Sequence, residues 1–343
     1  MWGKGTTVVE VYLKPLQNSE LIMSRTKPDP TLKQREQKVV IIVSSPSNGF
    51  DMMEKDLMNW SKTYKIHPYA YALPDISSLN YTRRHGFRPL LDAINTKNFM
   101  APRGFDNHNR TDYSKVKFLI DEFRHGFNAQ WMQNKDIVIG SDTFNSFQDE
   151  RIRQKLVNVL VKLMPWNDSR FSLYGSNDRI KVIVLYRSSR SKHFHSLWKE
   201  SSSKLKLEEW IASQGQDIFS TANEFIRHGA KDIDVVDVDY IVDMKYNLTH
   251  FIACKSLNLG CNGDGLLNSV VNGTTITTAT VLPTYESNIA NQETIERTLQ
   301  DFDCRYHFLR SDSVKFFPSE LRSIFSNCKG ATIDEISELK NHP

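Results

Sequence analysis

Apolar residues occur in short, nearly continuous runs along the middle of this chain, and longer segments with helical periodicity separate these runs. A run of five to seven aliphatic residues, rich in β-branched types, is typical of a parallel strand that is buried on both faces. Such runs, together with one mixed segment at 65–73, predict strands at 39–43, 65–73, 136–140, 180–186 and 233–238. We expect 233–238 to be the last parallel strand.

Helices are predicted between these strands, because apolar residues recur there every three or four positions. The clearest case is 150–163, where the apolar positions are Ile152, Leu156, Val159, Leu160 and Leu163. Other helices are predicted at 51–60, 116–131, 191–199, 207–226, 291–310 and 319–326. Alternating strands and helices predict an α/β fold with a doubly wound, mostly parallel sheet flanked by helices.

The two ends of the chain are polar and irregular, and they set the expected domain boundaries. We predict an N-terminal tail over 1–37, a single α/β domain over 38–330 and a C-terminal tail over 331–343. Gly3–Thr7 is superficially similar to a phosphate-binding loop. A strand pattern rather than a helix follows it, so we assign it to the tail. No apolar run approaches the roughly 18 residues that a membrane span requires.

Composition narrows the possible partners. The 343 residues are 39% hydrophobic and 24% charged, as in ordinary globular proteins, and the net charge is only +4. Lysines and arginines are scattered among acidic residues, which disfavours a nucleic-acid partner. The four cysteines include no C-x-x-C pair, so we expect no metal site.

The first candidate site follows the first strand, because ligands of open parallel sheets bind beyond the carboxyl ends of strands. Ser44–Phe50 is a loop of mostly small residues that leads into a predicted helix, whose N–H groups and dipole favour an anion. The pattern G-x-x-x-x-G-K-[S/T] is absent, which disfavours a nucleoside triphosphatase. The alternative is a βα turn that binds no ligand.

The second candidate site follows the strand 180–186. This strand ends at Arg187, and a basic helix begins a few residues later and carries Ser196 within its first two turns. An arginine fork and a nearby hydroxyl can hold a phosphate group. The alternative is a solvated basic helix that only anchors Trp198 in the core.

The segment 182–198 resembles the 3′-phosphate site of sulfotransferases, especially the sulfotransferase-like proteins of algae and diatoms. The similarity rests on Val184-Leu185-Tyr186-Arg187 and His195-Ser196-Leu197-Trp198, with weaker likeness at 137–142, 249–261 and 302–328. It implies a P-loop-like sulfotransferase architecture and 3′-phosphoadenosine 5′-phosphosulfate (PAPS) as co-substrate. It also implies that Arg187 and Ser196 hold the 3′-phosphate. The 5′ end of the nucleotide would then lie against Ser45, Ser47, Asn48, Gly49 and Phe50.

The first loop departs from the family, which carries Lys-[S/T]-Gly-Thr where this chain has Ser47-Asn48-Gly49-Phe50. The lost lysine contacts the sulfonate in the relatives, so catalysis is in doubt unless Lys55 or Lys192 replaces it. Asp142 lies where relatives often have a glutamate and is the candidate base, and the alternative for this residue is a helix N-cap. His67 and His125 are weaker candidates for the base.

The cysteines allow three disulfide pairings, and four reduced thiols are the alternative. The resemblance favours pairs 254–261 and 304–328 and a lumenal setting such as the Golgi, whereas composition alone leaves the cytoplasm open. Five N-x-[S/T] sequons, the number expected by chance in a chain of this composition, add little to the case for a glycoprotein.

These patterns lead to two functional hypotheses. The first is a sulfotransferase that transfers a sulfuryl group from PAPS to a hydroxyl or amine of a carbohydrate or small metabolite. The second is a catalytically inactive protein of the same fold that binds a nucleotide or an anionic glycan.

Overall fold

The computed structural model divides the chain into two units, 1–36 and 37–343. All residues that it describes lie in the second unit. They are 37–45, 48–50, 53, 69–71, 120–121, 124, 127–128, 131–132, 136–141, 150–167, 176–200, 204–206, 209–210, 218–257, 270–271, 274–275, 296–297, 299–300 and 303–328. The strand pattern that follows Gly3–Thr7 and the predicted tails, apart from Gln37, therefore lie outside the described residues.

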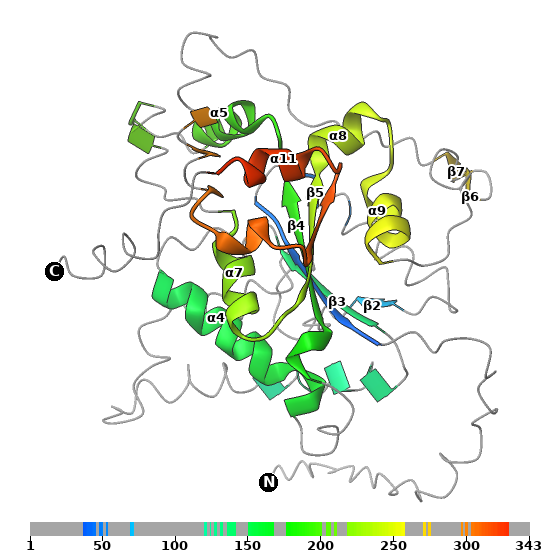
Figure 1. Ribbon diagram of the computed structural model, residues 1–343. Coiled ribbons are helices and arrows are strands. Elements are labelled where there is room, and N and C mark those ends of the chain that lie inside the picture. Colours follow the sequence, from blue (N-terminus) through cyan, green and yellow to red (C-terminus); the bar gives the residue numbers. More distant parts are fainter. Residues whose placement is uncertain are drawn as a thin grey trace, which may run out of the picture. The chain divides into compact units, whose positions relative to one another are not determined.

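A parallel sheet of six described strands forms the centre of this unit (Figure 1). Its spatial order is β2-β3-β1-β4-β5-β8, and every neighbouring pair is parallel. The strands are β1 (Val39–Val43), β2 (Tyr69–Tyr71), β3 (Asp136–Ser141), β4 (Ile180–Tyr186), β5 (Asp232–Asp237) and β8 (Val314–Phe317). The predicted α/β fold with a parallel sheet is confirmed.

The prediction that 233–238 is the last parallel strand is wrong, because β8 pairs with β5 in parallel. In β8 the burial alternates, with Val314 and Phe316 buried while Lys315 is exposed. Such an edge strand lacks the continuous apolar run of the central strands, so the pattern of apolar runs missed it.

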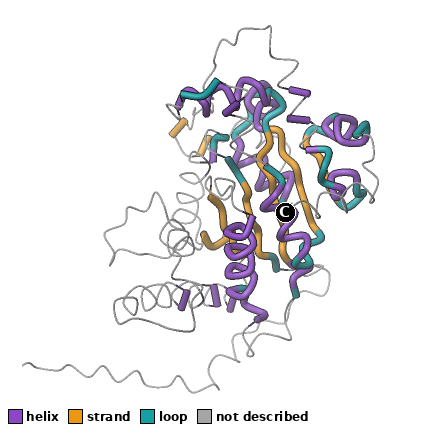
Figure 2. Tube along the Cα trace, turned by 90° about the vertical axis from the view of Figure 1, so that its left-hand side faces the viewer, coloured by secondary structure: helices purple, strands orange, loops and turns teal. Residues whose placement is uncertain are grey.

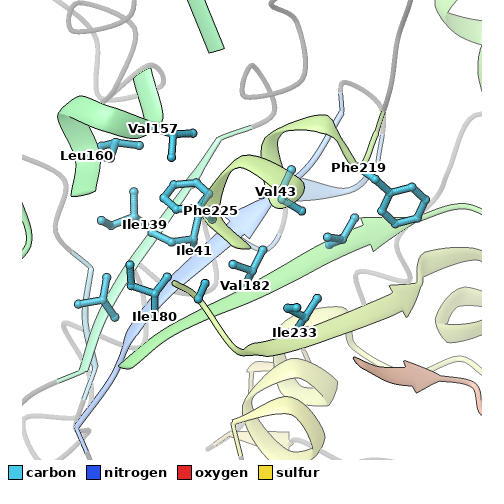
Figure 3. Packing of buried hydrophobic residues seen from close by; sticks show 14 of the residues in the cluster. Ile41, Val43, Ile139, Val157, Leu160, Ile180, Val182, Phe219, Phe225 and Ile233 are labelled. Carbon is cyan, nitrogen blue, oxygen red and sulfur yellow. The ribbon is translucent and has the colours of Figure 1, made fainter. Parts of the chain in front are cut away.

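One face of the sheet is covered by α4 (Glu150–Leu163), α7 (Ser220–Arg227) and α11 (Leu321–Ser326). Val157 and Leu160 of α4 pack over Ile41 and Ile139 in the same hydrophobic core, as Figure 3 shows. Figure 2 views the sheet from the side on which α4 and α7 lie. The predicted helix 150–163 has the bounds that were expected.

The other face is covered by α8 (Val238–Asp243), α9 (Leu248–Phe251) and the π-helical turn η8 (Ile252–Ser256). Their apolar side chains pack on the opposite side chains of the same strands, among them Ile42, Ile183 and Val236. Helices on both faces make the sheet doubly wound, and this explains why the central strands read as unbroken apolar runs.

The remaining described elements are short or lie beyond the strands. Helix α5 (Arg190–Glu200) follows β4 closely, as predicted. The helix predicted over 207–226 is not continuous, because Ile218 and Phe219 form a turn before α7. The others are η5 (Pro165–Asn167), η7 (Asn177–Arg179), η11 (His307–Arg310) and the antiparallel pair β6 (Val270–Val271) and β7 (Thr274–Thr275).

A buried ion-pair cluster lies at the amino ends of the strands, opposite to the expected ligand edge. Lys181 is only 2% exposed, and its Nζ lies 2.7 Å from Asp232 and 2.9 Å from the fully buried Asp234. Lys38 also pairs with Asp232. The cluster is balanced in charge, which is how a buried lysine is tolerated in an apolar sheet.

The predicted Cys304–Cys328 disulfide is present, with its Cα atoms 5.3 Å apart. Cys254 is also disulfide-bonded, whereas its predicted partner Cys261 lies outside the described residues. Within the described part of the chain, no helix is long and apolar enough to cross a membrane. That same part holds no cluster of three or more His, Cys, Asp or Glu side chains suited to a metal ion.

Candidate functional site

The strand order places a topological switch point between β1 and β4. From β1 the chain passes to β2 and β3 on one side of the sheet, whereas β4 is followed by β5 on the other side. The connections that leave the carboxyl ends of β1 and β4 therefore diverge, and a crevice for a ligand is expected at this point in doubly wound sheets. Ser44–Phe50 and Arg187–Arg190 follow these two strand ends.

The loop after β1 is held against the end of β4 by Asn48. Its Nδ2 donates a hydrogen bond of 2.9 Å to the main-chain carbonyl of Leu185, and the side chain is fully buried. Its main-chain N–H donates to the carbonyl of Ser45 at 3.3 Å, so this N–H is used within the turn. Gly49 follows with a φ of 77°, a left-handed conformation that favours glycine.

Phe50 belongs to the hydrophobic core. The residue is 4% exposed and packs in the cluster that also contains Met53 and Val138. A Cβ placed on Gly140 would lie 2.4 Å from Cε2 of the Phe50 ring, so the glycine provides the space for the ring. The ring of Phe50 is therefore a packing group of the core, and the place of this residue beside the 5′ end of a nucleotide stays a prediction.

Arg187 lies at the carboxyl end of β4, as predicted, and is 4% exposed. Its guanidinium pairs with Asp239 of α8, with Nε at 3.0 Å and Nη2 at 2.8 Å from Oδ1. Nη1 is buried and has no hydrogen-bond partner in the described structure. Burial alone would raise the pKa of Asp239, but the hydrogen bonds and charge of Arg187 lower it overall.

The two residues before α5 also bind Asp237, at the end of β5, and Asp239 of α8. The N–H and Oγ of Ser189 donate to Oδ2 of Asp239 at 3.0 and 2.6 Å. The N–H of Ser188 donates to Oδ1 of Asp237 at 3.1 Å, and Asp237 also caps α8 by accepting the N–H of Asp239. Burial raises the pKa of Asp237.

Arg190, the first residue of α5, forms a second buried ion pair with Asp303. Its guanidinium lies over the rings of Tyr186 and Phe194, 5.4 and 5.3 Å from their centroids. Burial raises the pKa of Asp303 to about 6, while the adjacent Arg190 opposes the rise. The pair joins the start of α5 to the residue next to Cys304.

Several predicted site residues lie outside the described structure, so their roles stay predictions. These are Ser47, Lys55 and Asp142. Ser196 lies in α5, but its side chain and that of Lys192 are not described. Ser45 is buried, and its carbonyl accepts the hydroxyl of Ser44 at 3.1 Å.

The aspartates that bind Arg187, Ser188 and Ser189 were not among the predicted site residues. Asp237 and Asp239 form an Asp-x-Asp pattern at the end of a buried apolar run, and acidic residues at a strand end are a usable signal in hindsight. They add negative charge at the switch point. The described site contains Arg187 and Arg190 against Asp237, Asp239 and Asp303, so it has no excess of positive charge.

Comparison with known proteins adds little. No family model and no curated protein matches the chain. A solved structure, the sulfotransferase domain of the olefin synthase of Synechococcus PCC 7002, aligns with 77% of this chain and 96% of its own. The identity is 12% and the TM-score 0.33, so this similarity carries no argument about the site or its activity.

Proposed function

We propose that this protein binds a 3′-phosphorylated adenine nucleotide at the β1–β4 switch point, and that it transfers the sulfuryl group of PAPS to a hydroxyl or amine. The proposal joins the resemblance of 182–198 to the 3′-phosphate site of sulfotransferases with the position of those residues in the fold. The acceptor would be a carbohydrate or a small metabolite.

The observation that carries the proposal is the state of Arg187. A buried guanidinium at the switch point, with Nη1 lacking a partner in the described structure, is costly unless a ligand supplies an acceptor. A phosphate oxygen is a strong acceptor for such a donor. Ser196 on α5 is the residue that we expect to complete this contact.

The residues that we assign to the transfer step lie outside the described part of the chain. Transfer forms a bond from the acceptor oxygen or nitrogen to sulfur and breaks the bond from sulfur to the bridging oxygen, and the acceptor's proton passes to a base. We assign Asp142 as that base and Lys55 as the cation beside the sulfonate. Both assignments rest on the resemblance and on position in the sequence, because cations are required where charge develops.

A second candidate function, nucleotide or glycan binding without transfer, is favoured by two observations. The ring of Phe50 fills the core at the position where relatives place a hydroxyl against the phosphosulfate. The N–H of Asn48 is used within its own turn, so it is not available to a 5′ group in this conformation. Both features weaken the catalytic end of the site and leave the 3′ end intact.

Calorimetry tests whether the protein binds the nucleotide and whether Arg187 recognises its 3′-phosphate. We expect wild-type protein to bind adenosine 3′,5′-bisphosphate more tightly than adenosine 5′-monophosphate. Arg187→Lys retains a positive charge beside Asp239 but lacks the planar fork, so bisphosphate binding should weaken while monophosphate binding changes little. A loss of about 2 kcal/mol or more is expected, by analogy with truncating one partner of a buried charge pair.

The control is Arg322→Lys, since Arg322 is half exposed on α11 and pairs with Asp312 instead of Asp239. It should leave both affinities unchanged. Equal losses for the two nucleotides in Arg187→Lys, or no nucleotide binding by the wild type, would contradict the proposal. Release of adenosine bisphosphate from PAPS over an acceptor panel then distinguishes transfer from binding alone.

A further inference from the structure

The contacts of Asp239 have the composition of an oxyanion site. Three hydrogen bonds and an ion pair converge on its carboxylate: Nε of Arg187 donates to Oδ1 and Nη2 lies 2.8 Å from the same oxygen, while the N–H and Oγ of Ser189 donate to Oδ2. An arginine fork, a hydroxyl and a main-chain N–H at the start of a helix are the groups that proteins use to hold phosphate or sulfate. We call Arg187 and Ser189 the oxyanion cradle.

Two further observations indicate that the oxyanion cradle is not a purely internal ion pair. Nη1 of Arg187 is buried without a partner in the described structure, so the carboxylate leaves one donor unsatisfied. The side chain of Asp239 is 15% exposed, Ser189 is partly exposed and Ser188 is exposed. Solvent therefore reaches the edge of the cradle.

We propose that Asp239 is a built-in carboxylate ligand of this cradle, occupying a site that accepts a phosphate or sulfate group when the carboxylate moves away or is replaced. The inference rests on the proposed function only in identifying the 3′-phosphate as the oxyanion that competes with Asp239. Asp239 would then be a positioning residue that orients the Arg187 fork and excludes weakly bound anions.

The charges explain why the carboxylate holds its place. Asp239 neutralises a buried guanidinium, and the lowered pKa of Asp239 keeps it ionised at neutral pH. Asp237 stays nearby, but its Oδ1 is engaged by the N–H groups of Ser188 and Asp239. An incoming dianion therefore meets one fixed carboxylate and has to displace the other, so free phosphate should bind the wild type poorly.

The test is rescue of Asp239→Ala by inorganic phosphate. This variant leaves the Arg187 charge unpaired, so its melting temperature should fall in sodium chloride. Sodium phosphate at matched ionic strength should restore it by about 5 °C or more at saturation, since a bound anion stabilises the folded state. The wild type should shift much less, and sodium sulfate in a parallel series shows whether the cradle distinguishes the two oxyanions.

Two variants serve as matched controls. Asp239→Asn removes the charge but fills the same volume, so its gain from phosphate should be smaller than that of Asp239→Ala. Arg187→Met/Asp239→Ala removes both charges, so it should fold and should show only the wild-type response. A phosphate gain in Asp239→Ala no larger than in the double variant would overturn the proposal.

Folding failure is also informative. Recovery of soluble Asp239→Ala in phosphate but not in chloride would support the proposal, and failure in both would count against it, because a bound oxyanion should replace the lost charge. If rescue succeeds while the wild type binds no adenosine bisphosphate, the cradle stands and the proposed nucleotide function falls. If the nucleotide binds but rescue fails, only the role of Asp239 is wrong.

Discussion

Asn48, on the loop after β1, donates a 2.9 Å hydrogen bond from Nδ2 to the main-chain carbonyl of Leu185 near the end of β4. This bond joins the loop after β1 to strand β4 across 137 positions of sequence, in a fully buried environment. The buried Oδ1 of the same side chain has no partner in the described structure. One amide thus ties the first candidate ligand segment to the strand that leads into the second.

Asn48→Ala should therefore lower the free energy of unfolding by about 1–3 kcal/mol, because the carbonyl of Leu185 loses a buried donor. Asn48→Asp should be more damaging at neutral pH, since it buries a carboxylate against a carbonyl oxygen. Urea denaturation measures both changes. Asn327→Ala, at an exposed position after α11, is the control and should change stability by less than about 0.5 kcal/mol. Equal effects at the two positions would contradict the role given to Asn48.

The contact between Phe50 and Gly140 leads to a second prediction. A methyl group on Gly140 would clash with Cε2 and Cζ of the ring at 2.4 and 2.6 Å, and it would also approach Cβ of Ile42 at 3.2 Å. Gly140→Ala should destabilise the protein by about 1–3 kcal/mol through overpacking. Phe50→Leu should relieve part of the clash, so the double variant should be more stable than the two single changes predict together. Simple additivity would show that the ring is not the obstacle.

Local patterns predicted the central strands because burial on both faces makes nearly every residue of such a strand apolar. They predicted α4 because its apolar residues recur every three or four positions. β4 was predicted with its bounds, even though it contains Lys181, because the neighbouring residues are all apolar. β8 was missed because only alternate residues of this edge strand are buried. What local sequence cannot supply is pairing between distant segments.

The same limit explains why the sequence predicted Arg187 but not its partner Asp239. The position of Arg187 at a strand end follows from the apolar run before it. Its pairing with Asp239 depends on the parallel register of β4 and β5, in which Tyr186 lies beside Asp237. No periodicity within either segment reveals that register, so the arginine was predicted without the carboxylate that holds it.

The buried Arg190–Asp303 pair predicts a pH dependence of stability. The folded-state pKa of Asp303, about 6, lies above its ordinary value of 3.8, so the folded state binds more protons between these values. Stability from this group is present below about pH 4 and is lost as the pH rises to about 6. The loss should be about 3 kcal/mol for the isolated group, an order-of-magnitude figure.

Urea midpoints of the wild type and Asp303→Asn between pH 4 and 7 test this prediction. The downward slope between pH 4 and 6 should be shallower in Asp303→Asn, which cannot titrate. Asp312→Asn is the control, since Asp312 is almost fully exposed, and it should keep the wild-type slope. Identical slopes for wild type and Asp303→Asn would refute the assignment.

The Cys304–Cys328 bond closes a segment of 24 positions that includes η11 and β8. Removing it with Cys304→Ala/Cys328→Ala should lower stability by about 3 kcal/mol, as expected for a loop of this length. Denaturation of the wild type with and without reductant should show a change of the same sign.

Non-reducing peptide mapping should also recover the predicted 254–261 pair, and free thiols at these positions in secreted protein would contradict the lumenal prediction.

The altered loop yields the prediction that separates catalysis from binding. Ser47→Lys returns a cation to the position where the sulfotransferases that this chain resembles have theirs, and Asp51→Ser removes the acid four positions further along the sequence. Phe50 should stay unchanged, because its ring is buried against Gly140 and Phe50→Thr would open a cavity in the core. If the protein is a weakened enzyme, the Ser47→Lys/Asp51→Ser variant should turn over PAPS about 100-fold faster or more, the scale of one transition-state donor.

Lys55→Ala tests the alternative, in which Lys55 already supplies the missing charge. The wild type should then be active, and Lys55→Ala should abolish turnover while adenosine bisphosphate binding persists. If wild type and repaired loop are both inert over a broad acceptor panel but bind the nucleotide, the protein is a binding protein of this fold. In that case the buried ring of Phe50 would be a physical reason why the chemistry has been lost while the 3′ end of the site remains.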